Sequence, residues 1–207
     1  HSKGADVLMD ICEDADALGI KYLTVYAFST ENWNRPSTEV AALMKLVTHY
    51  LRTIGKKAMK NNMRMRIIGD REGLSDDIQD AIVKLEDLTK NNTGLQFQIA
   101  INYGSRDEML RAMKKMLVDY KEDKFTLDEL DDAKYASYLD TADIPDPDLM
   151  IRTSGEERLS NYLMWQHAYS EFYFTKIPWP DFSKKDLMDA IRTYTGRDRR
   201  YGAIAEE

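Results

Sequence analysis

Residues 149–166 read LMIRTSGEERLSNYLMWQ, and this stretch combines a short apolar run with a loop rich in polar side chains. The run Leu149–Ile151 is typical of a buried strand. In an open α/β sheet, ligands bind beyond the carboxyl ends of the strands. Guanidinium groups and hydroxyls suit phosphate oxygens. The stretch therefore predicts a strand that leads into a site for a phosphorylated, and in particular a diphosphorylated, ligand. Its polar residues and loop glycine are Arg152, Thr153, Ser154, Gly155, Arg158, Ser160 and Asn161.

A second polar loop, Ser29–Pro36, follows another expected strand and reads STENWNRP. Its composition alone supports a ligand-binding loop and an ordinary polar loop equally. Trp33 favours the first, because an apolar ring in a polar loop is expected to cover a ligand or to move with a lid. For Arg152 and Arg158 the ordinary alternative is a surface salt bridge with Glu156 or Glu157. Such pairs contribute little stability.

Expected strands alternate with expected helices along the whole chain. This order predicts a single α/β domain over residues 1–207, with a central, mostly parallel β-sheet flanked by helices. The expected strands are 20–28, 63–68, 95–101, 149–151 and 172–174. The expected helices are 5–18, 37–61, 75–88, 105–117, 126–139 and 183–195.

The helix expected at 37–61 has an unusually broad apolar face. Ordinary core packing explains such a face, and so does the wall of an apolar tunnel, where methionine side chains adapt to a flexible ligand. The residues nominated for a tunnel wall are Met44, Val47, Leu51, Met63 and Leu95.

Composition excludes several classes of function. The 207 residues carry a formal net charge of −7, so we expect no nucleic-acid partner. The single cysteine, Cys12, cannot form an intrachain disulfide and fits a reducing compartment. No apolar run approaches the roughly 18 residues of a membrane span. The chain also lacks a phosphate loop of the form G-x-x-x-x-G-K-[ST] and the dinucleotide motif G-x-G-x-x-G.

Several long motifs make the chain resemble the cis-prenyltransferase family, in particular the bacterial undecaprenyl diphosphate synthases. The resemblance extends over essentially the whole chain. Its motifs are YAFSTENWNRP (26–36), IIGD (67–70), NNTGL (91–95), NYG (102–104), DPDLMIRTSGEERLSNYLMWQ (146–166), AYSEFYF (168–174), WPDF (179–182) and RDRRYG (197–202).

The resemblance implies an enzyme that condenses isopentenyl diphosphate onto farnesyl diphosphate with cis geometry. The implied product is undecaprenyl diphosphate, the C55 lipid carrier for cell-wall synthesis. Mg²⁺, a homodimer, a cytoplasmic location and a peripheral membrane contact for product release are implied as well. Two alternatives stay open: a non-catalytic partner subunit of a cis-prenyltransferase, and an unrelated α/β phosphotransferase that binds a nucleotide.

The resemblance also assigns roles to individual residues. Asn32 matches the position of proton removal, and we interpret it as an orienting group because an amide is a very poor base. Glu171 matches a metal ligand, whereas from the residues alone its carboxylate could equally pair with an arginine or hold a divalent cation. Arg197, Arg199 and Arg200 are expected to reach the partner subunit's site. The positions implied for substrate binding are His1, Ser29, Thr30, Glu31, Trp33, Arg35, Arg152, Arg158, Leu159 and Ser160.

One family feature is absent from these residues. The family begins with a strand that ends in the motif Asp-Gly-Asn-Gly-Arg-Trp, which would precede His1. We therefore expect the 207 residues to lack the first strand and half of the diphosphate site. We also expect a polypeptide that starts at His1 to be inactive alone, which a turnover assay checks.

Overall fold

A computed structural model describes residues 2–197, and every strand pair in that range is parallel. Three strands form one sheet in the order β1-β3-β2, and two more form a separate sheet, β4-β5. The α/β class and the expected strands are confirmed. The sheet is divided, however, because β1 and β4 do not pair. The strands are β1 (Tyr22–Ser29), β2 (Arg64–Ile68), β3 (Gln96–Tyr103), β4 (Leu149–Arg152) and β5 (Glu171–Phe174).

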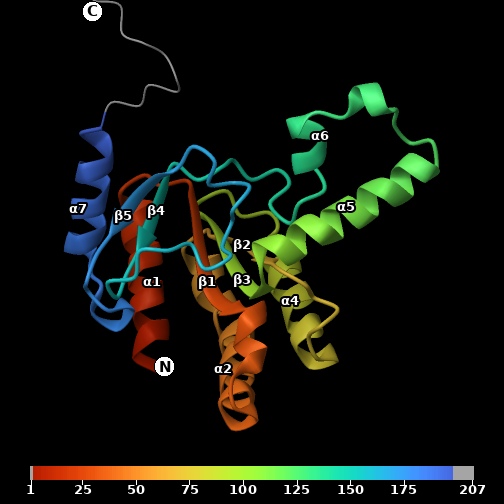
Figure 1. The fold of residues 1–207 in the computed structure, drawn as a ribbon. Coiled ribbons are helices and arrows are strands. Elements are labelled where there is room, and N and C mark those ends of the chain that lie inside the picture. Colours follow the sequence, from red (N-terminus) through yellow and green to blue (C-terminus); the bar gives the residue numbers. More distant parts are fainter. Residues whose placement is uncertain (1, 198–207) are drawn as a thin grey trace, which may run out of the picture.

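Helices pack around both sheets, and α5 extends away from them (Figure 1). Helices α1 and α7 lie beside β4 and β5, whereas α2 and α4 lie by the larger sheet. The α-helices are α1 (Ser2–Ala17), α2 (Ser37–Thr53), α3 (Gly55–Lys60), α4 (Asp76–Thr89), α5 (Ser105–Lys121), α6 (Asp132–Ala136) and α7 (Lys184–Thr195). Short 3-10 helices are η1 (Thr30–Asn34), η2 (Leu127–Glu129) and η3 (Trp179–Asp181).

Strand β3 lies at the centre of the larger sheet and is buried from Phe97 to Tyr103. A central parallel strand is covered on both faces, so nearly all of its side chains need to be apolar. Ile99 pairs with Val25 of β1 and with Ile67 of β2 in the same register. This alignment brings the carboxyl ends of β1 and β3 to the same edge, where the polar loops begin.

Two expected helices are shorter than the sequence suggested. The helix expected at 37–61 is interrupted at Ile54, and α3 begins at Gly55, whose backbone closely approaches Leu88 of α4. The helix expected at 126–139 is wrong over most of its length. Thr126 and Glu129 do form the expected capping box, but it caps only the 3-10 turn η2. Asp131 then accepts a hydrogen bond from the backbone N–H of Lys134 and starts the separate short helix α6.

Candidate active site

The two polar loops meet at the carboxyl ends of β1 and β4. Helix η1 continues directly from Ser29 at the end of β1, and the other loop follows Arg152. The Asn161 amide donates a hydrogen bond of 2.8 Å to Glu31 Oε1 and so joins the loops. The rings of Tyr26 and Tyr162 stack beneath them with centroids 4.5 Å apart. The expectation that both loops open on one crevice is therefore confirmed.

A cavity of about 1640 Å³ lies between the loops, strand β1, strand β4 and helix α2. One part of its lining is polar and includes three guanidinium groups. Another part is apolar and comes from α2. The predicted substrate residues that line it are Ser29, Glu31, Arg35, Arg152, Arg158, Leu159 and Ser160, together with Asn32. The apolar lining from α2 is Leu43, Leu46, Val47, Tyr50 and Leu51. This arrangement suits a ligand with an anionic head and a hydrocarbon tail.

The three cavity arginines are held by weak, exposed contacts. Arg35 pairs with Glu39 at 2.9 Å, and Arg152 donates to Ser160 Oγ at 3.3 Å. Arg158 pairs with Glu156, as the salt-bridge alternative proposed. Exposed ion pairs contribute only about 0–1 kcal/mol. A diphosphate can therefore replace these partners at little cost.

Helix η1 holds Asn32 and Glu31 in defined positions. The side-chain oxygen of Asn32 accepts a hydrogen bond of 2.9 Å from the Ser29 backbone N–H. Burial alone would raise the pKa of Glu31, but hydrogen bonds from Asn161, its own backbone, Ser29 and Thr30 outweigh burial and lower the pKa. Glu31 is therefore an anion near neutral pH and cannot serve there as a proton donor.

Trp33 and Thr30 do not line the cavity. The indole N–H of Trp33 donates a hydrogen bond of 2.7 Å to Asn102 Oδ1, and its ring meets Phe28 edge-on at 5.1 Å. Trp33 is 42% exposed, and its indole lies against Asn102 near the end of β3. The Thr30 hydroxyl donates to Glu31 Oε2 at 3.2 Å.

Glu171 lies apart from the cavity arginines. It begins β5 opposite Leu149, whereas Arg152 pairs with Phe174 at the other end of the sheet. Three residues of strand separate these ends, about 10 Å. The Glu171 carboxylate pairs with Arg197. Within residues 2–197, no three histidine, cysteine, aspartate or glutamate side chains gather into a group that could hold a metal ion.

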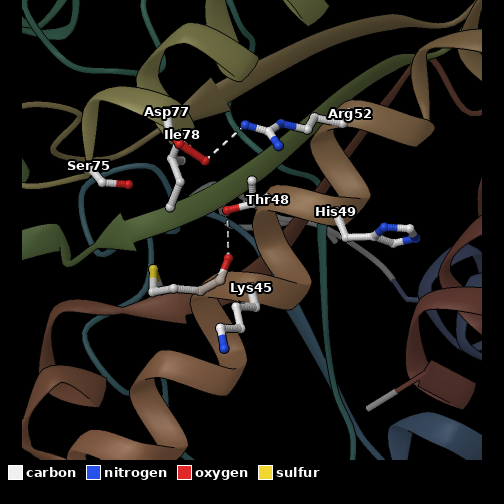
Figure 2. Close-up of a pocket in the computed structure, with 8 residues that line it drawn as sticks. Lys45, Thr48, His49, Arg52, Ser75, Asp77 and Ile78 are labelled. Atoms are coloured by element: carbon white, nitrogen blue, oxygen red, sulfur yellow. Dashed lines mark hydrogen bonds and ion pairs between the residues drawn. The ribbon is translucent and has the colours of Figure 1, made fainter.

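Several other predictions have different outcomes. His1, Arg199 and Arg200 lie outside the described residues. Of the nominated tunnel wall, Val47 and Leu51 do line the cavity, whereas Met63 and Leu95 are buried in the core. Met44 lies elsewhere, in a shallow hollow between α2 and α4 (Figure 2).

The hollow in Figure 2 uses a different face of α2 from the cavity. Its volume is about 510 Å³, and it is wide open to solvent. Lys45 and Arg52 carry its positive charge, but Arg52 already pairs with Asp77 at 2.9 Å. None of the predicted site residues lies there.

Several further residues shape the site, and of these the sequence predicted only Asn161 as part of the ligand loop. Asn161 and Asn102 hold the loops, and both have left-handed backbones, with φ of 59° and 49°. Below them, three buried atoms without a hydrogen-bond partner belong to residues that line the cavity: Tyr162 Oη, Gln166 Oε1 and His167 Nε2. In the sequence, these residues are marked only by their place within the polar motifs. Left-handed backbone and long-range contacts leave no local pattern.

His167 is a packed histidine with a defined tautomer. Burial lowers the pKa of its imidazole to about 4, so the ring is neutral. The Ser170 hydroxyl donates to Pro147 O and must therefore accept from His167 Nδ1–H. The remaining nitrogen, Nε2, is thus an acceptor.

Comparison with known proteins identifies the family. The family model described as "Putative undecaprenyl diphosphate synthase" matches residues 1–202. The chain is 48% identical to an isoprenyl transferase of Clostridium acetobutylicum, covering 99% of this chain and 80% of that relative. It is 47% identical to an isoprenyl transferase of Agrobacterium fabrum, covering 100% of this chain and 84% of that protein.

Solved structures agree with this result. The crystal structure of lavandulyl diphosphate synthase from Lavandula x intermedia in complex with dimethylallyl diphosphate superposes with a TM-score of 0.93. It is 37% identical, and the match covers 98% of this chain and 87% of that one. A probable undecaprenyl diphosphate synthase from Campylobacter jejuni superposes with a TM-score of 0.87 at 35% identity, covering 98% of this chain and 93% of that one. The fold and site thus define an α/β prenyltransferase, and the chain belongs to the undecaprenyl diphosphate synthase family.

Proposed function

We propose that the protein condenses isopentenyl diphosphate onto farnesyl diphosphate with cis geometry and makes undecaprenyl diphosphate. The observation that carries the proposal is the single cavity in which Arg35, Arg152 and Arg158 face the same space as the apolar wall of α2. The arginines match diphosphate oxygens, and the wall matches an isoprenoid chain. The isoprenyl transferase relatives support the same reaction.

The chemistry sets what these residues need to do. The allylic C–O bond ionises with diphosphate as leaving group, the double bond of isopentenyl diphosphate attacks, and a proton leaves the carbon beside the new bond. Cationic donors aimed at the departing diphosphate stabilise the charge that develops on it. Arg152, Arg158 and Ser160 bind isopentenyl diphosphate, while Ser29, Glu31 and Arg35 belong to the substrate loop.

Asn32 is the proposed catalytic residue, in an orienting role. Its Oδ1 is engaged by Ser29 N–H, which fixes the plane of the amide at the cavity wall. The amide is too weak a base to accept the proton at neutral pH, so water or the diphosphate is the acceptor. An Asn32→Asp variant that retained the full rate would contradict this role.

Mg²⁺ is the proposed cofactor, as it is for the family, and Glu171 is its proposed ligand. The carboxylate fits, because Mg²⁺ is usually bound through one or two carboxylates, with phosphate oxygens and water completing its shell. When bound, the ion would neutralise diphosphate charge. The location fits poorly, since Glu171 and Arg152 lie at opposite ends of their sheet.

Calorimetric titration with Mg²⁺ and a substrate diphosphate tests Glu171. Glu171→Gln is expected to weaken Mg²⁺ binding, while Arg197→Gln breaks the same ion pair but keeps the carboxylate. Equal Mg²⁺ affinity in the two variants would rule out Glu171 as ligand.

We also propose one domain, completed by a strand between β1 and β4. Within residues 2–197, both strands have an edge that pairs with no other strand, and both line the cavity. Such a strand would run beside three polar atoms that now lack a partner: Tyr162 Oη, Gln166 Oε1 and His167 Nε2. Hydrogen exchange tests this proposal. Amides of β1 and β4 should exchange more slowly in a chain that carries the family's Asp-Gly-Asn-Gly-Arg-Trp strand, and unchanged rates would contradict it.

A homodimer is the proposed assembly, and α5 supplies a surface for it. Leu110, Met113 and Leu117 are exposed at helical spacing, with Val118 and Tyr120 beside them. A contiguous apolar face of this kind is typical of a protein–protein interface. Helix α5 extends away from the sheets (Figure 1), and its exposed apolar residues are accessible to a second copy.

The proposed setting is the cytoplasm, where the product would serve cell-wall synthesis. Cys12 is free and buried, as expected in a reducing compartment. None of the helices in residues 2–197 combines the length and apolar composition that a membrane crossing requires. Release of a C55 product calls for peripheral membrane contact, which sedimentation with lipid vesicles tests. Recovery of the protein with integral membrane proteins after a high-salt wash would contradict this proposal.

The non-catalytic alternative is not favoured. Both polar loops are intact, and their arginines line one cavity with Asn32. Incubation of the natural protein with farnesyl diphosphate and radiolabelled isopentenyl diphosphate, followed by sizing of the lipids, tests the reaction. We expect C55 products. The absence of any labelled lipid would overturn the proposal.

A further inference from the structure

The side chain of Asn102 forms hydrogen bonds with two partners, of which one is a donor and the other an acceptor. The indole N–H of Trp33 can only donate, and it contacts Oδ1 at 2.7 Å. The carbonyl of Asp70 can only accept, and it takes a hydrogen bond from Nδ2 at 2.9 Å. The orientation of the amide is therefore fixed, and no side chain other than asparagine satisfies both partners with this geometry.

The backbone around Asn102 is built to hold this amide. Asn102 is 4% exposed and left-handed, with φ of 49°, a conformation that asparagine tolerates better than most residues. Its carbonyl accepts a hydrogen bond of 3.0 Å from the Asp70 N–H, so residue 102 binds both polar backbone groups of residue 70. The Gly73 backbone closes over the amide so tightly that an added Cβ would lie 2.7 Å from Nδ2.

Trp33 lies in η1 directly after Asn32, and the contact with Asn102 joins this helix to the end of β3. The indole is otherwise anchored by Phe28, which it meets edge-on. This short helix places Glu31 and Asn32 at the cavity wall. Displacement of the indole would therefore move both side chains. Misplacement of catalytic groups by about 1 Å can lower rates about 100-fold.

We propose that Asn102 is a positioning residue that fixes Trp33 and, through it, the substrate loop Thr30–Asn34. This inference rests on the proposed function of that loop. Asn102 itself is absent from the lining of the cavity, so it acts through Trp33 and does not touch substrate.

The test compares Asn102→Gly with Trp33→Phe and with the double variant in the intact natural protein. Glycine keeps the left-handed backbone and removes the amide. Phenylalanine keeps a ring and removes the indole N–H. NMR follows the indole protons of the three tryptophans, Trp33, Trp165 and Trp179. We expect Asn102→Gly to speed exchange of the Trp33 indole proton about tenfold or more.

Steady-state kinetics of the two single variants and the double variant, with both substrates, complete a double-mutant cycle. Each single variant should lower kcat about 10- to 100-fold, and the double variant should be no worse than either, because both remove the same contact. Unchanged exchange of the Trp33 indole proton, or losses that multiply in the double variant, would overturn the inference. No turnover by the wild type would contradict the proposed function instead, and the exchange rates would still decide whether Asn102 anchors Trp33.

Asn62→Gly is the matched control. Asn62 is also left-handed, with φ of 51°, and its amide bonds Thr93 at the opposite end of the sheet. The control also removes a hydrogen-bonded amide from a left-handed position, and it should leave both the Trp33 exchange rate and kcat unchanged. A general effect of lost stability would instead lower kcat in Asn62→Gly as well.

Discussion

Arg152 illustrates how much a single side chain contributes to this site. Its guanidinium lies at the end of β4, lines the cavity and donates a hydrogen bond to Ser160. Arg152→Ala should raise KM for isopentenyl diphosphate roughly 10- to 100-fold, the range expected for a lost hydrogen bond to a charged group. The control is Arg52→Ala, since Arg52 pairs with Asp77 in the separate hollow. An unchanged KM in Arg152→Ala would show that Arg152 does not bind isopentenyl diphosphate.

His167 makes stability depend on pH. Burial lowers the pKa of its imidazole from 6.5 to about 4, so the unfolded chain binds a proton more readily than the folded one. Its contribution to stability is complete above about pH 6.5 and is lost as the pH falls toward 4. Between pH 7.5 and 4.5 the free energy of unfolding should fall by about 1–3 kcal/mol more in wild type than in His167→Gln. Chemical denaturation measures this difference, and parallel pH profiles would contradict it.

At the scale of elements, helix α2 separates two environments. Leu46 lines the cavity, and its neighbour Lys45 lines the hollow in Figure 2. Leu46→Trp should fill part of the cavity and shorten the product by about one or more isoprene units. The side chains around the cavity are close-packed, so they cannot move aside to restore the volume that the larger ring takes up. Lys45→Trp adds the same ring on the other face and should leave product length unchanged. Sizing of labelled products measures both, and equal lengths would show that α2 does not set the limit.

Sequence patterns predicted the strands and the long helices well, because their apolar periods are local. They failed at residues 126–139, where the capping box of Thr126 and Glu129 is the same whether an α-helix or a 3-10 turn follows. They could not indicate the orientation of Trp33, because it depends on Asn102, a residue 69 positions away. Loop chemistry predicted the cavity arginines. The distance between Glu171 and Arg152 follows from strand register, which composition does not reveal.

At the scale of the whole molecule, the apolar face of α5 is expected to form the homodimer interface. Leu117→Glu places a charge within this face, and burying an unpaired charge in an interface is strongly unfavourable. The variant should sediment as a monomer at concentrations where the wild type is a dimer. The control Lys115→Glu also introduces a glutamate on α5, but on another face of the helix, away from Leu110, Met113 and Leu117. A dimeric Leu117→Glu protein would exclude α5 as the interface.

The account depends on one cavity that accepts a diphosphate at its arginines and a hydrocarbon chain along α2. A crystal structure of the natural protein with a non-hydrolysable farnesyl diphosphate analogue and isopentenyl diphosphate tests this most directly. We predict diphosphate oxygens within hydrogen-bond distance of Arg152 and Arg158, with the farnesyl chain against Leu46, Val47 and Tyr50. Ligands bound in the hollow between α2 and α4, or a cavity closed by side chains in that crystal, would contradict it.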